Sequence, residues 1–374
     1  MRPGVFHPPK APRMKVAQVM AGGRVGGAEA FYERLTVALH AAGEDVLPVI
    51  RSDPARAARL AVHGVTPVQL GFGTWLDLAT RLRLRARLRA FRPAVVVAWM
   101  NRAASFTPRG PWTLVGRLGG YYDLKYYRHC DHLVGNTRDL VAWIVSQGWP
   151  RERAHYLPNF VTDMDEVLPA DLDLPPGALP GAPRLLGLGR LHRNKGFDTL
   201  LRALPHLPGA VLTLAGEGPE HEALVRLAGE LGVADRVQFL GWRQDSGALL
   251  AACDIFVCSS RHEPLGNVVL EAWSAGKPVV AVAAQGPSEL IRDGETGVLV
   301  PPESPEALAV AIGALLADPA RRAALGEAGR AAYAAGFAEG PVLARWQGFL
   351  RQVAPPAAAA PARSLSAELP GGRS

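Results

Sequence analysis

Short apolar runs alternate with helix-length periodic segments over the first 161 residues. Apolar runs bounded by turn residues are typical of buried strands, whereas apolar positions spaced by three and four residues predict amphipathic helices. The pattern predicts strands at 15–20, 45–50, 66–70, 94–100, 113–118, 132–134 and 155–157, and helices at 28–42, 57–63, 74–91 and 138–148. This alternation indicates a parallel sheet that is covered by helices.

The same alternation begins again in the second half of the chain. It predicts strands at 184–189, 211–215, 236–240, 254–258, 278–282 and 297–300, helices at 196–207 and 220–231, and helical structure over 305–353. We therefore expect an α/β protein with two doubly wound, Rossmann-like domains that face each other across a cleft. In such a protein the ligand binds where the carboxyl ends of both sheets meet.

The domain boundaries follow from composition. A proline-rich stretch without periodicity predicts a linker at 166–183, between a first domain at 15–165 and a second at 184–340. Residues 1–14 form an N-terminal extension, and either Met1 or Met14 could be the start, because the first strand follows Met14 directly. Residues 354–374 are rich in Ala, Pro, Gly and Ser, which predicts a disordered tail.

The positive charge of the chain is concentrated in its first half. Residues 1–160 contain 23 Lys and Arg against 10 Asp and Glu, whereas residues 161–374 contain 18 against 24. Six arginines lie between Arg81 and Arg92, and Leu84, Leu88 and Phe91 give that segment one apolar stripe. The segment is either a solvated helix of an Arg-rich protein or a contact for anionic lipid or a phosphorylated acceptor. Nucleic acid is not expected as a partner, because no aromatic-interleaved basic motif is present.

Several classes of protein are disfavoured. No run of about eighteen apolar residues predicts a transmembrane helix, and the first residues lack the apolar core of a signal peptide. The three cysteines, Cys130, Cys253 and Cys258, give neither a disulfide framework nor a metal-binding spacing. We expect a cytoplasmic protein with no metal site.

The segment from Ser260 to Trp273 contains the most informative chemistry. A buried strand at 254–258 is followed by a turn containing Glu263, Pro264 and Gly266, and then by a helix containing Glu271. Asn267 is the predicted N-cap of that helix. The start of a helix stabilises an anion with its free backbone N–H groups. Two carboxylates beside such a site suit a phosphate that is flanked by hydroxyl groups, as in a nucleotide sugar.

Three other strand ends carry candidate residues. Gly26 and Gly27 belong to a glycine-rich loop after the first strand, which is either a phosphate-binding loop or merely a tight turn. The loop lacks the dinucleotide fingerprint, and no acidic residue follows the second strand, so an NAD site is disfavoured. Arg190 and Lys195 follow the first strand of the second domain, where two cations could neutralise a diphosphate leaving group. Glu217 and Trp242, after the next two strands, are either structural or in contact with the nucleotide.

These motifs occur in an order that resembles the retaining glycosyltransferases of the family-four group, also called glycosyl transferases group 1. The resemblance includes Arg190, Lys195-Gly196-Phe197-Asp198, Gly216-Glu217-Gly218-Pro219, Glu263-x7-Glu271, Gly276-Lys277-Pro278 and Asp293-Gly294-x-x-Gly297, and more thinly Gly26-Gly27-Ala28-Glu29 and Leu157-Pro158-Asn159. It implies the two-domain GT-B fold, an acceptor-binding first domain, a nucleotide-sugar-binding second domain, and a C-terminal helix at 341–353 that returns to the first domain.

The resemblance also implies roles for individual residues. Glu271 would bind the ribose hydroxyls, whereas Glu263 and the backbone of Leu265, Gly266 and Asn267 would hold the donor sugar and phosphates. Arg190 and Lys195 would stabilise the departing diphosphate without a metal or other cofactor, and Gly27 would close on it from the first domain.

The chain departs from the family after its fifth predicted strand, where many members carry a His-Asp pair. Here a glycine pair leads into a tyrosine-rich segment, whose candidates for contact with the sugar or acceptor are Tyr121, Tyr122, Asp123, Lys125 and His129. The alternative is a tyrosine-rich helix that packs on the sheet, with His129 an ordinary surface residue.

The function expected is transfer of a sugar, with retention, from a nucleoside diphosphate to a glycan or lipid-linked acceptor, as in lipopolysaccharide or cell-envelope polysaccharide synthesis. Peripheral contact with an anionic membrane at its inner face would occur through the basic first domain. The alternatives are a sugar-nucleotide epimerase or hydrolase of the same fold, and a non-catalytic nucleotide-sugar-binding protein.

Overall fold

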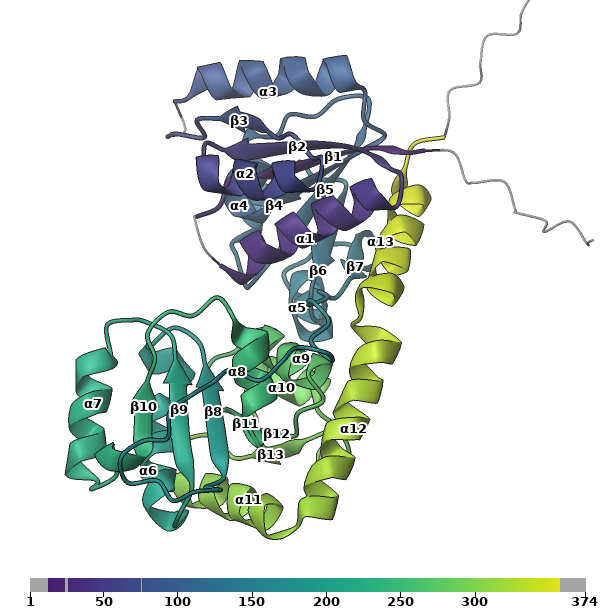
Figure 1. The fold of residues 1–374 in the computed structure, drawn as a ribbon. Helices are drawn as coiled ribbons and strands as arrows, with labels where there is room; N and C mark the ends of the chain where they lie inside the picture. The colour runs from purple at the N-terminus through teal and green to yellow at the C-terminus, as the bar shows by residue number, and fades with distance from the viewer. Residues whose placement is uncertain (1–12, 24–25, 75, 357–374) are drawn as a thin grey trace, which may run out of the picture.

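The structure, a computed structural model, describes residues 13–23, 26–74 and 76–356. Most of the predicted N-terminal extension and of the predicted disordered tail lies outside these residues. Two α/β lobes lie one above the other, and two long helices run along the same side of both (Figure 1). The expectation of two doubly wound domains is confirmed.

The first sheet has seven parallel strands in the order β3-β2-β1-β4-β5-β6-β7. The strands are β1 (Lys15–Met20), β2 (Asp45–Arg51), β3 (Val68–Leu70), β4 (Val95–Trp99), β5 (Thr113–Leu118), β6 (His132–Gly135) and β7 (Ala154–Tyr156). The helices that follow them are α1 (Gly27–Ala41), α2 (Pro54–Val62), α3 (Leu78–Phe91), α4 (Met100–Phe106) and α5 (Arg138–Ser146). All five residues of β4 are buried, as expected for a central parallel strand covered on both faces.

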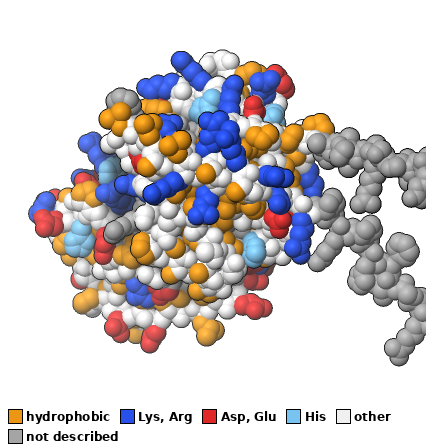
Figure 2. Space-filling view, turned by 90° about the horizontal axis from the view of Figure 1, so that it is seen from above, with side chains coloured by type: hydrophobic (Ala, Val, Ile, Leu, Met, Phe, Trp, Pro, Cys, Tyr) orange, Lys and Arg blue, Asp and Glu red, His pale blue; other side chains and the backbone are white. Residues whose placement is uncertain are grey.

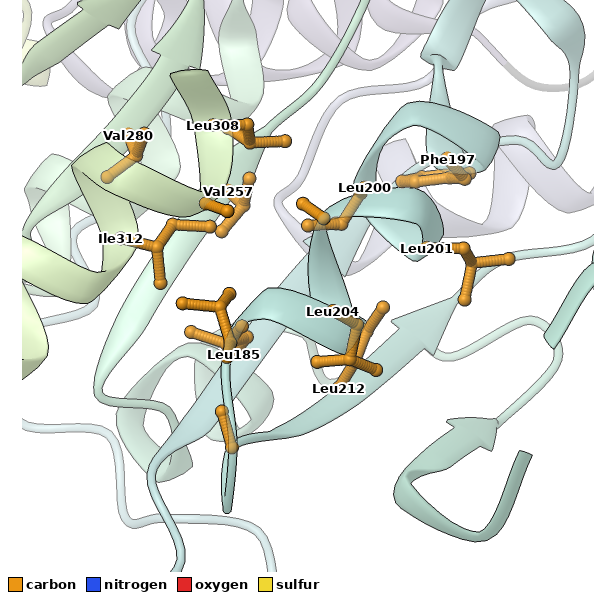
Figure 3. Packing of buried hydrophobic residues seen from close by; sticks show 14 of the residues in the cluster. Leu185, Phe197, Leu200, Leu201, Leu204, Leu212, Val257, Val280, Leu308 and Ile312 are labelled. Carbon is orange, nitrogen blue, oxygen red and sulfur yellow. The ribbon is translucent and has the colours of Figure 1, made fainter. Parts of the chain in front are cut away.

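The second sheet has six strands in the order β10-β9-β8-β11-β12-β13, and all its pairings are parallel. The strands are β8 (Arg184–Leu188), β9 (Val211–Ala215), β10 (Val237–Phe239), β11 (Ile255–Cys258), β12 (Val279–Val282) and β13 (Val298–Val300). The helices are α6 (Phe197–Ala203), α7 (His221–Glu230), α8 (Ser246–Ala252), α9 (Asn267–Ser274), α10 (Gln285–Leu290) and α11 (Pro305–Ala317). Figure 3 shows the core under α6 and α11, in which leucines and valines of helices and sheet interdigitate.

The strand order reverses at β1–β4 in the first sheet and at β8–β11 in the second. At such a point the loops after two neighbouring strands leave toward opposite faces of the sheet, which opens a crevice at the carboxyl ends. The glycine-rich loop follows β1, whereas the Arg190–Lys195 and Glu263–Gly266 segments follow β8 and β11. The topology therefore places these three segments at the carboxyl ends of strands that flank the reversal points, where a ligand can bind.

Two helices connect the lobes at the end of the chain: α12 (Pro319–Gly336) lies along the second domain, and α13 (Glu339–Val353) lies along the first (Figure 1). The Trp346 ring of α13 stacks on Trp99 of β4 at a centroid distance of 6.2 Å. Arg351 donates a hydrogen bond of 2.6 Å to the Glu44 carboxylate, and Thr113 donates one of 2.6 Å to the Val353 carbonyl. The C-terminal helix is therefore part of the core of the first domain.

The predicted helix at 74–91 begins later, at Leu78, because the Asp77 side chain accepts a hydrogen bond from the Thr80 N–H and caps the helix there. The prediction that Asn267 caps α9 is wrong, because Gly266 is the N-cap and adopts a φ of 82° that glycine tolerates best. The short helices α4 and α8 were not predicted. Each has seven residues, too few for a 3.6-residue period to be read from sequence.

Candidate active site

The glycine-rich loop after β1 is held by the Glu29 carboxylate. Glu29 Oε1 accepts a hydrogen bond of 2.8 Å from the Gly23 N–H, and a Cβ atom at either Gly22 or Gly26 would collide with the Glu29 carboxylate. A side chain at either glycine would therefore displace the Glu29 carboxylate from the loop. Arg24 and Val25, at the tip, lie outside the described residues.

Gly27, at the start of α1, lies against the second domain. A Cβ atom at Gly27 would be 2.9 Å from the Asn267 Nδ2 atom, in the first turn of α9. The loops after β1 and β11 therefore meet, as predicted for a crevice between the carboxyl ends of the two sheets.

Lys195 and Glu263 form an ion pair on the second-domain side of this contact. Lys195 Nζ lies 2.5 Å from Glu263 Oε2, and the Ser260 hydroxyl donates a hydrogen bond of 3.2 Å to the same oxygen. Burial alone would lower the pKa of Lys195, but the Glu263 carboxylate outweighs it and holds the pKa above its usual value. The lysine is therefore a permanent cation, fixed over Gly189 at the end of β8.

The turn that leads into α9 leaves backbone donors available. Gly266 supplies no side-chain cap to α9, so the first-turn N–H groups can bind an anion. The turn is fixed from behind, because the Gly286 N–H donates a hydrogen bond of 2.7 Å to the Glu263 carbonyl and Leu265 is buried. This is a rigid anion-binding arrangement beside the Lys195 cation.

Glu271, one turn further along α9, is enclosed between the domains. Its surface is partly exposed, yet burial raises the pKa of its carboxyl to about 7, Arg34 and Lys195 oppose the rise, and Glu263 adds to it. Arg34 comes from α1 of the first domain and was not predicted, because its position in the helical pattern is that of any polar residue. Glu271 is consequently a hydrogen-bond acceptor that titrates near neutral pH and is flanked by a cation from each domain.

The remaining donor candidates lie at the ends of β8, β9 and β10. Arg190 is exposed, and its side chain forms no ion pair within the described part of the chain. The Leu191 N–H donates to the Glu217 carbonyl, and the Trp242 N–H donates a long hydrogen bond of 3.4 Å to Glu217 Oε1. Trp242 is 56% exposed, which leaves its ring available to a nucleobase. The ends of these three strands therefore lie next to one another, and a role for Glu217 and Trp242 in nucleotide contact stays a prediction.

A buried arginine that the sequence did not single out supports the interdomain contact. Arg117 of β5 is 1% exposed, and burial lowers its pKa to about 10. Its guanidinium lies over the Trp99 ring and donates a hydrogen bond of 2.6 Å to Asn159 Oδ1, and Asn159 in turn donates one of 3.3 Å to Asn267 Oδ1. A charged residue inside an otherwise apolar strand was the available signal.

The tyrosine-rich segment after β5 divides into several environments. Tyr121 donates a hydrogen bond to Asp139, whereas Tyr122 lies beside Gly119, Gly120 and the Met100 sulfur. Asp123 and Lys125 form an exposed ion pair of 2.8 Å.

The His129 ring is held by two backbone carbonyl groups. Its Nε2 atom is 2.9 Å from the Ala104 carbonyl oxygen and 3.1 Å from that of Thr107, so the ring connects this segment to the end of α4. Tyr122 lies close to the glycine-rich loop, because Met100, beside its hydroxyl, also adjoins Gly22.

Within the described residues, no group of three or more His, Cys, Asp or Glu side chains is arranged to hold a metal ion. The same part of the chain contains no helix long and apolar enough to cross a bilayer. The three cysteines are buried and unpaired.

Comparison with known proteins identifies the family of the chain. The model for "Glycosyl transferases group 1" matches residues 176–332, and that for "Glycosyltransferase Family 4" matches residues 25–163. The lipopolysaccharide core biosynthesis glycosyltransferase LpsE of Rhizobium meliloti is 38% identical over 82% of this chain and 90% of its own length. LpsD of the same organism is 37% identical over 87% of this chain and 95% of its own length.

Solved structures show the same fold. HepE of Anabaena, in complex with UDP-glucose, matches 91% of this chain and 100% of its own at a TM-score of 0.77 and 21% identity. WaaG, described as a glycosyltransferase involved in lipopolysaccharide biosynthesis, matches 90% of this chain and 99% of its own at a TM-score of 0.66 and 20% identity. With two parallel-sheet domains and matches to both family models, the chain belongs to the group 1 and family 4 glycosyltransferases of GT-B fold, and it is a glycosyltransferase.

Proposed function

We propose that this glycosyltransferase moves a sugar, with retention, from a nucleoside diphosphate to a glycan or lipid-linked acceptor in lipopolysaccharide core synthesis. Two relatives that match more than four fifths of the chain are named for lipopolysaccharide core biosynthesis. The solved HepE structures contain UDP or UDP-glucose, which supports a nucleotide-sugar donor, and uridine is the first base to test.

The observation that carries the proposal is the Lys195–Glu263 ion pair beside the uncapped start of α9, opposite Gly27 of the first domain. Cations and backbone N–H groups that are fixed before the reaction stabilise charge as it develops, which is usually the largest contribution to such catalysis. Lys195, Arg190 and the first-turn N–H groups of α9 would neutralise the diphosphate. Glu271 would accept hydrogen bonds from the ribose hydroxyls, and Glu263 would hold the donor sugar.

The proposed reaction needs no nucleophile from the protein. The acceptor oxygen attacks the anomeric carbon on the face from which the diphosphate leaves, and a leaving phosphate oxygen takes the acceptor proton. The product then has the donor's anomeric configuration, which NMR of the product measures directly. Because two cations serve the leaving group, activity is expected to persist in excess EDTA.

The test is a transfer assay with core-truncated lipopolysaccharide as acceptor and a panel of UDP-sugars and GDP-mannose as donors. Acceptor mass and released nucleoside diphosphate are both measured. Lys195→Ala is expected to lower kcat at least about 100-fold by removing charge stabilisation, whereas Arg202→Gln, an exposed arginine on α6, serves as the matched control. Nucleotide release that does not need acceptor would favour the hydrolase or epimerase alternative. Donor binding without turnover would favour a non-catalytic binding protein.

We also propose that α3 places the enzyme on an anionic membrane, at its cytoplasmic face. Leu84 and Leu88 are buried, whereas Leu78 and Leu82 are 66% and 68% exposed among exposed arginines. Figure 2 looks onto this side of the molecule, where Lys and Arg side chains are spread between hydrophobic ones. Arg81 is an exception, because it donates to the Ser105 carbonyl and lies over the Phe106 ring.

Vesicle sedimentation tests this membrane contact. Binding to phosphatidylglycerol vesicles should exceed binding to phosphatidylcholine vesicles and fall with added salt, because surface charges are screened. The double variant Leu78→Ser with Leu82→Ser should bind phosphatidylglycerol vesicles more weakly than the unmodified protein, because the exposed leucines contribute by inserting into the lipid. Equal binding to both lipids would contradict the proposal.

A further inference from the structure

A hollow of about 950 Å³ lies between α5, β7 and α13. It shares no residue with the Lys195–Glu263 site. Its polar lining includes Arg138, Arg151 and Arg345, and its apolar side includes Tyr156 and Phe349. The three arginines come from three different segments, so the fold, rather than a local charge run, brings them together.

The charge of this hollow is not balanced. None of the three arginines forms an ion pair with a carboxylate within the residues that the structure describes. Glu152 is the single acidic residue among the described lining residues. Glu289, which approaches from α10, is already engaged by the N–H groups of Arg138 and Asp139 at the start of α5.

The three cations act on one region. The Arg138 guanidinium lies 4.8 Å from the centroid of the Tyr156 ring. Burial raises the pKa of Tyr156 to about 12, Glu289 adds to the rise, and both Arg138 and Arg345 oppose it. The third arginine, Arg151, acts in the same way on the neighbouring His155 ring. All three arginines therefore lie close enough to β7 to make that side of the hollow electropositive.

An aromatic surface accompanies these cations. His155 Nε2 is 3.0 Å from His132 Nδ1, and the His155 ring lies 4.7 Å from the Phe349 ring of α13. Burial, His132 and Arg151 lower the pKa of His155 to about 4, so the ring is neutral at pH 7. At neutral pH the hollow therefore presents charged guanidinium groups beside the uncharged rings of His155 and Phe349.

We propose that this hollow binds a phosphomonoester group, at a site separate from the donor site. Arginine binds phosphate oxygens through two parallel N–H donors, and three unpaired arginines match a doubly charged phosphomonoester. The aromatic side suits the apolar face of a sugar ring, and the volume accommodates a ligand of this size. The phosphate can belong to a free sugar phosphate or to a phosphorylated lipid head group.

The test measures binding of glucose 6-phosphate to the full chain by calorimetry, with glucose as the neutral control. Arg138→Gln with Arg345→Gln is expected to weaken binding at least about tenfold, since hydrogen bonds between charged groups are the strong class. Arg151→Gln provides an independent variant. Arg202→Gln is the matched control, and Lys195→Ala shows whether the phosphate instead occupies the donor site. All four arginines are exposed, so folding should persist, and the Tm of each variant verifies it.

A parallel arm uses vesicles of phosphatidylcholine with and without phosphatidic acid, and it distinguishes a lipid-borne phosphate from a free one. Binding in either arm that the Arg138/Arg345 variant loses, and that Lys195→Ala retains, supports the proposal. The proposal is overturned if glucose 6-phosphate and phosphatidic acid both bind the double variant as well as they bind the unmodified protein. It is also overturned if neither binds, or if Lys195→Ala abolishes binding.

Discussion

Asn159, at the end of the first domain, donates a hydrogen bond of 3.3 Å to Asn267, in the first turn of α9 in the second domain. Asn159 itself accepts a hydrogen bond of 2.6 Å from the buried Arg117, and the Asn267 side chain lies next to Gly27, where it would meet an added Cβ atom. One amide pair thus connects the sheet of the first domain to the helix whose N-terminus we propose as part of the donor site. This pair therefore links the spacing between the domains to the position of the turn that precedes α9.

The first prediction is that the two asparagines are energetically coupled. Asn159→Ala and Asn267→Ala should each weaken donor binding, and the double variant should lose less than the sum, with a coupling of about 0.5–1.5 kcal/mol. Calorimetry with the donor measures the cycle. Additive losses would contradict the role of this hydrogen bond, and Asn101→Ala, outside the contact, should change nothing.

The second prediction concerns the space at Gly27. Gly27→Ala places a Cβ atom 2.9 Å from Asn267 Nδ2, closer than ordinary contact, so either the Asn267 side chain must shift and strain its hydrogen bond to Asn159, or the domains must separate slightly. We expect the KM for the donor to rise several-fold with little change in Tm. Gly340→Ala, where the added Cβ meets nothing within 4 Å, is the matched control. An unchanged KM for Gly27→Ala would show that the contact does not form during turnover.

The third prediction is a dependence of stability on pH through Glu271. Burial raises the pKa of this carboxyl from 4.5 to about 7. Between these values the native state binds more protons than the unfolded state, so the free energy of unfolding falls as pH rises through this window. Glu271→Gln removes the cost of burying the ionised form. It should be more stable than the unmodified protein by about 1–3 kcal/mol at pH 8, with the difference nearly absent at pH 4.5.

Urea unfolding of both proteins at the two pH values measures this difference. The affinity of the unmodified protein for the donor should rise as pH rises through the same window, because the ionised carboxylate is the better acceptor for ribose hydroxyls. In Glu271→Gln the donor affinity should not depend on pH in this window. A stability difference that is independent of pH would show that Glu271 is ionised throughout.

The fourth prediction is that α13 is essential to the first domain. Trp346 is fully buried and stacks on Trp99, so Trp346→Ala should lower the free energy of unfolding by about 3–5 kcal/mol through lost burial and cavity formation. Arg345→Ala, the exposed neighbour, should cost less than about 0.5 kcal/mol. Equal effects of the two changes on urea midpoints would contradict the packing of α13 against β4.

Local pattern predicted most of the strands and long helices of this chain. Strands 15–20, 113–118 and 211–215 occur with the predicted ends, because a buried parallel strand is a continuous apolar run between turn residues. The predicted neighbours Lys195 and Glu263 also meet, since the order of motifs along a doubly wound chain places strand ends at one edge. Pattern failed for α4 and α8, which are too short to show a period, and at Asn267, where backbone conformation decided the cap.

The sequence by itself determined two βα-repeating domains, a glycine-rich loop after β1, and a carboxylate–cation set at the ends of β8 and β11. Its signals are local: hydrophobic period, turn residues and charges at strand ends. Only the tertiary structure decided that Asn267 binds Asn159, that Arg34 of one domain faces Glu271 of the other, and that His129 holds a loop. These contacts join residues far apart in the chain, and they depend on how two domains pack, which no local spacing encodes.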